Sequence, residues 1–146
     1  MEITVKGFKH GERIPDQFTC RGLDTQPTVE ISDVPADAKS IVVIMEDPDA
    51  PMGTFTHWIA YNIPPDTYRL DRGSKHSEMS FGINDFGNEG YNGPCPPKGA
   101  PHRYYFRAYA TSLERLPNGM HRKPLDDKLK SSTIEKCEYM GTYSNG

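Results

Sequence analysis

Residues 40–51 read SIVVIMEDPDAP, and this stretch decides the fold of the chain. Its first part, residues 40–46, is apolar or β-branched on both faces of an extended chain, which predicts a central, buried strand. That strand leads directly into Asp47 and a loop whose two prolines fix the backbone φ angle. A second strand is predicted over residues 57–63. We therefore expect two neighbouring strands joined by a rigid Asp-Pro loop.

Other segments with alternating apolar and polar residues predict further short strands. The strongest is residues 102–111, and a single late helix is predicted over residues 124–138, with Leu125, Leu129 and Cys137 on one face. Many strands and one helix predict a mostly-β, antiparallel sandwich with a peripheral helix, in one domain over residues 1–146. The remaining predicted strands are residues 2–6, 28–31, 80–84 and 141–144, and the stretch 64–101 is expected to be rich in turns.

Composition excludes several classes of function. The 146 residues carry a net charge of −3 without a basic run, which argues against a general nucleic-acid surface. The chain opens as a strand rather than as a signal peptide, and its longest apolar run, residues 41–45, is far too short for a transmembrane segment. A cytoplasmic protein is therefore expected.

The three cysteines, at positions 20, 95 and 137, form neither a CxxC pair nor a zinc-binding spacing. An odd number excludes a complete disulfide framework. Three reduced thiols are the expectation for a cytoplasmic chain, and one bridge, such as Cys20 to Cys137, stays open.

A second proline-rich stretch, residues 90–97, reads GYNGPCPP and precedes His102-Arg103-Tyr104. His102 and Tyr104 are two residues apart on the predicted strand, so they share a face. Such loops can hold polar groups in place, since proline lowers the entropy of the backbone. We expect the two proline-rich loops to meet at one small pocket.

A pocket edged by imidazole and phenol donors suits an anion such as phosphate. In this interpretation Asp47 and Asp49 orient the imidazoles of His57 and His102 and fix which nitrogen carries the proton. Backbone N–H groups around Gly93 could add a nest for the anion.

Three other interpretations use the same residues. The two histidines could be structural side chains with satisfied hydrogen bonds. They could form a two-histidine, one-carboxylate metal site, although no helical histidine spacing supports it. Cys95 could act as a nucleophile with a histidine, although its position between two prolines offers no activation by a helix N-terminus.

Taken together, the two motifs resemble the phosphatidylethanolamine-binding protein family, which includes Raf kinase inhibitor proteins and plant flowering-time regulators. Residues 47–51 with His57-Trp58, followed by residues 90–97 with His102-Arg103-Tyr104, carry the likeness. It spans nearly the whole chain and is closest to the compact bacterial and archaeal branch. The resemblance implies two antiparallel sheets with Greek-key links, a frequent cis proline in the first motif, for which Ala50–Pro51 is the candidate, and frequent dimers.

By motif position, the resemblance also implies the residues of an anion pocket. It accepts phosphate, a carboxylate such as acetate, or a phospholipid head group, without a metal or cofactor. Family members act mostly by binding, so a kinase or protease partner is expected rather than a catalytic reaction. The alternatives are a serine-protease inhibitor acting through a surface loop, and a hydrolase of small esters or phosphates with His57 or His102 as the general base. The implied ligand-binding residues are Asp47, Asp49, Pro51, His57, Gly93, Pro94, His102 and Tyr104.

Overall fold

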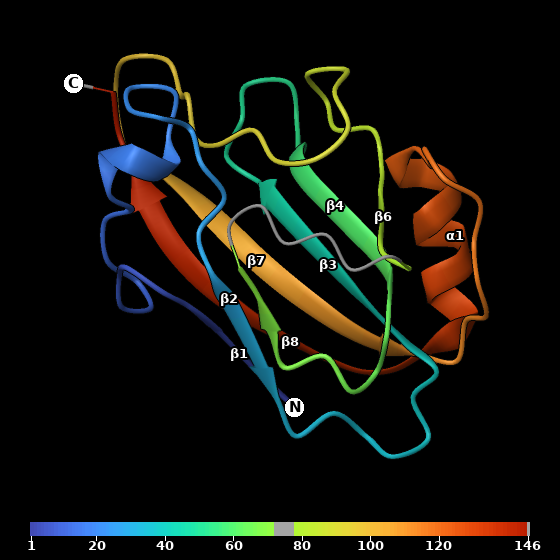
Figure 1. Cartoon of the computed structure of the whole chain (residues 1–146). Helices are drawn as coiled ribbons and strands as arrows, with labels where there is room; N and C mark the ends of the chain where they lie inside the picture. Colours follow the sequence, from blue (N-terminus) through green and yellow to red (C-terminus); the bar gives the residue numbers. More distant parts are fainter. Residues whose placement is uncertain (72–77, 146) are drawn as a thin grey trace.

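The computed structural model describes residues 1–71 and 78–145 and consists mostly of strands, with one α-helix (Figure 1). Part of the turn-rich stretch 64–101, residues 72–77, lies outside the described residues. The elements are β1 (Glu2–Val5), the 3₁₀ helix η1 (Asp16–Phe18), β2 (Val29–Ser32), β3 (Ser40–Asp47), β4 (Phe55–Ile63), β5 (Arg69–Leu70), β6 (Ser80–Phe81), β7 (His102–Thr111), α1 (Arg122–Ser132) and β8 (Thr133–Tyr143).

The strands form two antiparallel sheets. One has three strands in the order β1-β2-β5, and the other has five in the order β6-β4-β3-β7-β8. Within the larger sheet, β7 returns to lie beside β3, on the side away from β4 and β6. The resulting order β7-β3-β4-β6 is the 4-1-2-3 arrangement of a Greek key. The predicted mostly-β architecture of two antiparallel sheets is confirmed.

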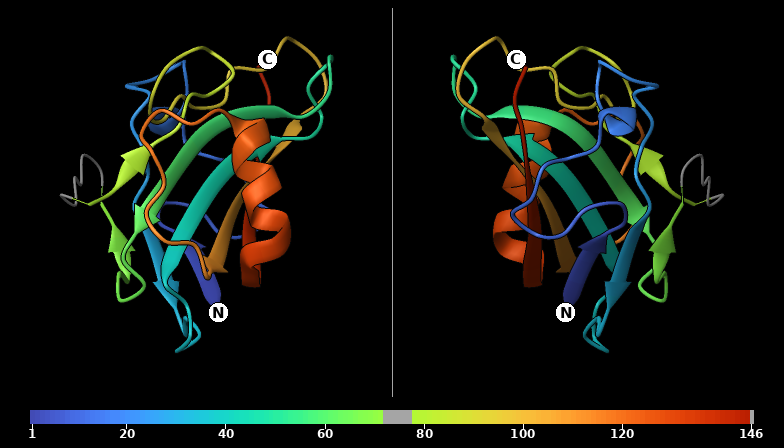
Figure 2. Two further views of the ribbon diagram at one scale, coloured as in Figure 1. Left: turned by 90° about the vertical axis from the view of Figure 1, so that its right-hand side faces the viewer. Right: turned by 90° about the vertical axis from the view of Figure 1, so that its left-hand side faces the viewer.

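The five-stranded sheet is covered on both faces. The two views of Figure 2 show α1 on one side of it and β1 with β2 on the other. Residues of β3 alternate between two apolar clusters: Val43 and Met45 pack between the sheets, whereas Val42 and Ile44 pack with Leu125 of the helix. All eight residues of β3 are buried for this reason, as its sequence predicts.

The predicted helix is too long at its C-terminal end. It begins near the expected residue but ends at Ser132, and residues 133–143 form β8 along the whole of β7. Cys137 pairs with Ala108 across these strands and is not on a helix face. The β-branched pair Thr133 and Ile134 favours extended backbone, and the free edge of β7 supplies hydrogen-bond partners that outweigh a weak helical period. Within the described ranges no helix is both long and apolar enough to cross a membrane.

Candidate functional site

A β-bulge in β4 places His57 on the inner face of the large sheet. Met45 pairs with Trp58 but Glu46 pairs with Thr56, so His57 is an extra residue in β4. Thr56 then turns to the helix side, where Arg122 donates to its hydroxyl over 3.1 Å. His57 turns inwards instead, with its ring 5.3 Å from the ring of Tyr104 in β7. Bulges of this kind commonly re-aim a side chain beside a functional site.

Asp47 and His102 meet where β3 ends and β7 begins. The Nδ1–H of His102 donates to Oδ2 of Asp47 over 2.7 Å, and the other carboxylate oxygen accepts the backbone N–H of Asp49 over 2.8 Å. Asp47 is buried, so these two bonds satisfy a charge that is shielded from water. The carboxylate fixes the proton of His102 on Nδ1 and leaves Nε2 without a partner in the described chain.

His57 is oriented in the same way by a backbone carbonyl. Its Nδ1–H donates to the oxygen of Asn92 over 2.8 Å, and the Asn92 N–H donates back to the His57 oxygen over 3.1 Å. The buried Asn84 amide holds the side chain of Asn92, donating to its Oδ1 over 2.7 Å. Burial lowers the pKa of His57, because the charged imidazolium is poorly solvated there.

Tyr104 lies between the two histidines. Its ring stacks against His102 at 6.5 Å, and the edge-on contact with His57 lies on the other side. The side chain is fully buried, yet its hydroxyl has no hydrogen-bond partner. Burial raises the pKa of Tyr104, and the negative charge of Asp47 adds to the rise although neither carboxylate oxygen meets hydrogen-bond geometry with the phenol. The group is a neutral, unused donor.

These side chains line one cavity of about 210 Å³, which we call the two-histidine pocket. The expected convergence of the two loops is thus present in the structure. Five of the eight residues implied by the motifs line it, whereas Asp49, Gly93 and Pro94 do not. The lining residues are Asp47, Ala50, Pro51, Phe55, His57, Phe86, Cys95, Pro96, Pro97, His102 and Tyr104.

Asp49 is engaged outside the pocket. Its carboxylate accepts two hydrogen bonds from the Arg103 guanidinium, at 2.8 and 2.9 Å, and a third from the Arg103 backbone. These hydrogen bonds lower the pKa of Asp49 to about 2. Asp49 therefore ties the Asp-Pro loop to the start of β7 and does not contact either histidine by hydrogen bond.

Gly93 and Pro94 lie behind the pocket wall, against the segment around η1. The Gly93 N–H donates to Asp24 Oδ1 over 2.9 Å, and a Cβ at Gly93 would lie 1.9 Å from the Phe18 oxygen. The Pro94 oxygen accepts the Cys20 N–H over 3.1 Å. The expected anion nest at Gly93 is therefore wrong, because its N–H already has a carboxylate partner.

Sequence reasoning missed two aromatic residues of the pocket and the segment that supports it. Phe55 and Phe86 contact each other at 4.9 Å, and Phe86 lies edge-on to His57 at 5.4 Å. Phe55 lies two residues before the predicted strand 57–63, so a strand extended to the true start of β4 would have included it. Phe86 and residues 16–24 lie in irregular segments whose sequence carries no such periodicity.

The chain matches the model of the phosphatidylethanolamine-binding protein family over residues 4–144. It belongs to this family. A relative in Aquifex aeolicus, named UPF0098 protein, is 45% identical, with 98% of this chain and 88% of the relative covered. The crystal structure of the Chlamydia trachomatis phosphatidylethanolamine-binding protein homologue CT736 superposes with a TM-score of 0.92 at 38% identity, covering 99% and 97% of the two chains. Escherichia coli YbcL, described as a member of the mammalian family, gives a TM-score of 0.92 at 31% identity, covering 99% and 98%.

Membership makes this chain a binding protein of the phosphatidylethanolamine-binding protein kind, as its two motifs indicate. One expectation drawn from the family resemblance is wrong here. No described peptide bond is cis, so the candidate Ala50–Pro51 bond is trans.

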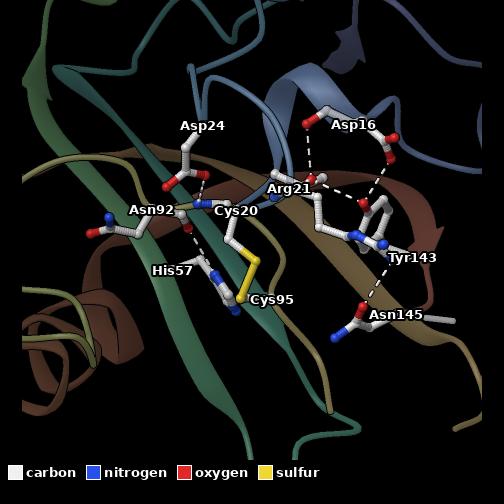
Figure 3. Close-up of a disulfide and its surroundings, with 11 residues drawn as sticks. Asp16, Cys20, Arg21, Asp24, His57, Asn92, Cys95, Tyr143 and Asn145 are labelled. Carbon is white, nitrogen blue, oxygen red and sulfur yellow. Dashed lines mark hydrogen bonds between the residues drawn. A yellow bond between two sulfur atoms is a disulfide. The ribbon is translucent and has the colours of Figure 1, made fainter. Parts of the chain in front are cut away.

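The expectation of three reduced thiols is also wrong for this member of the family. Cys20 and Cys95 form a disulfide that links the segment around η1 to the 90–97 loop (Figure 3). The disulfide considered possible from the sequence, Cys20 to Cys137, does not form, because Cys137 lies in β8, away from Cys20. Burial raises the pKa of the Cys137 thiol to about 11. The pairing also removes the Cys95 thiol that a nucleophilic mechanism would need.

The metal-site interpretation finds no matching geometry. The described residues, 1–71 and 78–145, contain no cluster of three His, Cys, Asp or Glu side chains placed to hold a metal ion. Asp47 and His102 are hydrogen-bonded to each other, and His57 is bonded to a carbonyl.

Proposed function

We propose that this protein binds a small anionic group, a phosphate or a carboxylate, in the two-histidine pocket. The observation that carries the proposal is the Tyr104 hydroxyl, which is buried in the pocket lining without a hydrogen-bond partner. A buried polar group without a partner costs about 1–3 kcal/mol, so such groups are rare. Trp58 Nε1 is the other such atom among the described side chains, and it does not line the pocket.

Two imidazoles supply further donors beside this hydroxyl. His57 and His102 both use Nδ1 within the chain, so Nε2 of each ring is the nitrogen free for a ligand. Once protonated, each ring can donate Nε2–H to an anion, and such charge-assisted bonds are about twice as strong as neutral ones. Asp47 balances the positive charge of His102 from the opposite side of the ring.

The rest of the pocket lining is mostly apolar. Pro51, Phe55, Phe86, Pro96 and Pro97 form its walls. Hydrogen bonds to an anion strengthen where water is excluded, because the local dielectric is low. A cavity of about 210 Å³ is smaller than the roughly 300–1,000 Å³ of pockets that hold drug-sized ligands. It suits a single phosphate or carboxylate, free or as the head group of a larger molecule.

We infer further that binding serves to regulate or inhibit another protein, a kinase or a protease, and that the protein acts in the cytoplasm as a homodimer. The support for the partner and the dimer is the family resemblance of the motifs. Cys95 is in a disulfide and offers no thiol to the pocket, which counts against the interpretation of Cys95 as a nucleophile.

Thermal unfolding with added phosphate or acetate tests the pocket directly. A ligand present at 100 times its Kd stabilises the folded state by about 2.7 kcal/mol, which raises Tm by several degrees in a chain of this size. Tyr104→Phe removes only the hydroxyl and is expected to weaken phosphate binding about ten- to a hundredfold, the loss of one hydrogen bond to a charged ligand. Chloride at the same ionic strength is the salt control.

Tyr109→Phe is the matched control for Tyr104→Phe. Tyr109 is on the same strand but faces the helix side, so its substitution should leave phosphate binding unchanged. Equal binding by the wild type and Tyr104→Phe would contradict the proposal. Stoichiometric inhibition of a serine protease that survives Tyr104→Phe would favour the surface-loop inhibitor, and turnover of a phosphate ester that is lost with His57→Gln would favour the hydrolase.

A further inference from the structure

The Cys20–Cys95 disulfide forms part of the wall of the two-histidine pocket and is open to solvent. Cys95 is one of the lining residues, and both half-cystines are exposed at the surface. The bond joins positions 75 residues apart, so it closes a long loop of the chain. Figure 3 shows it beside the bond between Asn92 and His57.

The chain before Cys95 is held firmly without the disulfide. The Tyr91 hydroxyl donates to the Phe18 oxygen over 2.7 Å, and the Gly93 N–H donates to Asp24. Asn92 exchanges two hydrogen bonds with His57, and Pro94 accepts one from Cys20. The carbonyl that orients His57 thus lies in a segment with its own network of hydrogen bonds.

The chain after Cys95 is held differently. Residues 96–101 make no hydrogen bond to any described residue, up to the start of β7 at His102. Pro96 and Pro97 lack an N–H, which accounts for part of this. The disulfide at Cys95 is therefore the last cross-link before residues 96–101, the segment that carries the Pro96 and Pro97 wall of the pocket.

We propose that this disulfide is a redox control of the anion pocket, an inference that rests on the proposed anion binding. With the bond closed, the wall from Cys95 to Pro97 is preorganised and the pocket holds its ligand. With the bond reduced, the wall gains freedom that must be lost again on binding, and water reaches the donors. The affinity for phosphate is then expected to fall about tenfold, while His57 keeps its orientation.

The reaction is a thiol–disulfide exchange with a dithiol as reductant. A thiolate of the dithiol attacks one exposed sulfur, the Cys20–Cys95 bond breaks, and a mixed disulfide forms. The second thiol of the reductant then closes its own disulfide. Two electrons and two protons have passed from the dithiol to the protein, which now carries thiols at both positions. Both half-cystines lie at the exposed surface, which favours access by a dithiol.

The experiment compares phosphate binding by the oxidised and the dithiothreitol-reduced protein, using calorimetry in a Cys137→Ser background. Cys137 is the free cysteine, so its removal leaves Cys20 and Cys95 as the thiols that respond. Circular dichroism checks that the reduced protein is folded at the temperature used. ¹⁵N NMR should show that the His57 ring keeps its Nδ1–H tautomer in both states, which a general loosening of the fold would not preserve.

A second variant tests the wall itself, with the disulfide intact. Pro96→Gly with Pro97→Gly loosens the wall and should reproduce the loss of phosphate affinity even if the reduced protein unfolds. Equal affinities in the oxidised, reduced and double-glycine proteins would overturn the redox proposal while leaving anion binding in place. If the oxidised protein itself binds neither phosphate nor acetate, the proposed function fails and the redox control falls with it.

Discussion

The carboxylate of Asp47 and the imidazole of His102 are joined by a 2.7 Å hydrogen bond across the ends of two neighbouring strands. Both groups are largely shielded from water, with side-chain exposures of 5% and 13%. The bond decides which ring nitrogen of His102 is left for a ligand, so it links the register of β3 and β7 to the chemistry of the pocket.

Asp47→Asn should weaken phosphate binding about tenfold, because an amide cannot accept from both Asp49 and His102 as the carboxylate does. The proton of His102 is then no longer fixed on Nδ1. Calorimetry measures the affinity, and ¹⁵N NMR of the ring reports the tautomer. Asp127→Asn, an exposed carboxylate of α1, is the control. A normal affinity with an altered tautomer would show that Asp47 does not act through His102.

Acetate affinity should rise as the pH falls from 8 towards 6, a range in which the carboxylate of acetate stays ionised. Burial keeps the pKa of free His57 below its ordinary value, so the ring is neutral at pH 7. A bound anion favours the imidazolium, which raises the pKa in the complex, and binding therefore takes up a proton. The affinity stops rising once the pH is below the pKa of His57 in the ligand-free protein.

His57→Gln should flatten this pH profile. His121→Gln, on the exposed residue before α1, should leave it unchanged. Both profiles come from acetate titrations, repeated at each pH with the ionic strength held constant, because inorganic phosphate itself takes up a proton near neutral pH. A profile that stays steep without His57 would assign the proton uptake to another group.

Gly93→Ala should destabilise the protein by about 3 kcal/mol, which is the cost of forcing atoms into a packed site. The added methyl group would lie 1.9 Å from the Phe18 oxygen, a backbone atom that cannot move alone. Urea unfolding measures the loss. Gly11→Ala is a comparison at an open turn, where the positive φ of 87° should cost only about 1 kcal/mol. A smaller loss at Gly93 than at Gly11 would mean that η1 is easily displaced.

Asp49→Asn should lower stability by less than about 1 kcal/mol at pH 7, because its partner Arg103 is half exposed and solvent screens the pair. The pKa of Asp49 in the folded protein is about 2, below its value in the unfolded chain. Its contribution is therefore complete above about pH 4 and is lost as the pH falls towards 2. Unfolding midpoints of the wild type and the variant should converge between these values. If the unfolding midpoints of the two proteins differ by a constant amount down to pH 2, the stabilisation does not come from the ionised Asp49 carboxylate.

The long strands and the main site residues were predictable because they follow local rules. β-Branched runs and alternation identify β3 and β7, and proline-locked loops at their ends place Asp47 and His102. The strands β5 and β6 could be identified less well, because two residues are too few to show the alternation of apolar and polar side chains that marks a strand. The end of α1 was wrong for a related reason: the spacing of Leu125, Leu129 and Cys137 fits a helix, but pairing with β7 decides the structure beyond Ser132.

The supports of the pocket could not be predicted from local sequence. The Cys20–Cys95 pairing, the Asp24 contact with Gly93 and the position of Phe86 all depend on how irregular segments cross in space. No period or motif connects residues so far apart, and with three cysteines the sequence allows three different single bridges. Such contacts need the assembled fold.

The extra residue in β4 has a consequence for any redesign or comparison of this strand. Deleting Thr56 would restore regular pairing and place His57 opposite Glu46, on the face of the sheet towards α1, so that the inner wall loses its imidazole although no pocket residue is substituted. The length of β4 must therefore be preserved. A chain that keeps every histidine but lacks the extra residue in β4 should fold normally and yet fail to bind its anion.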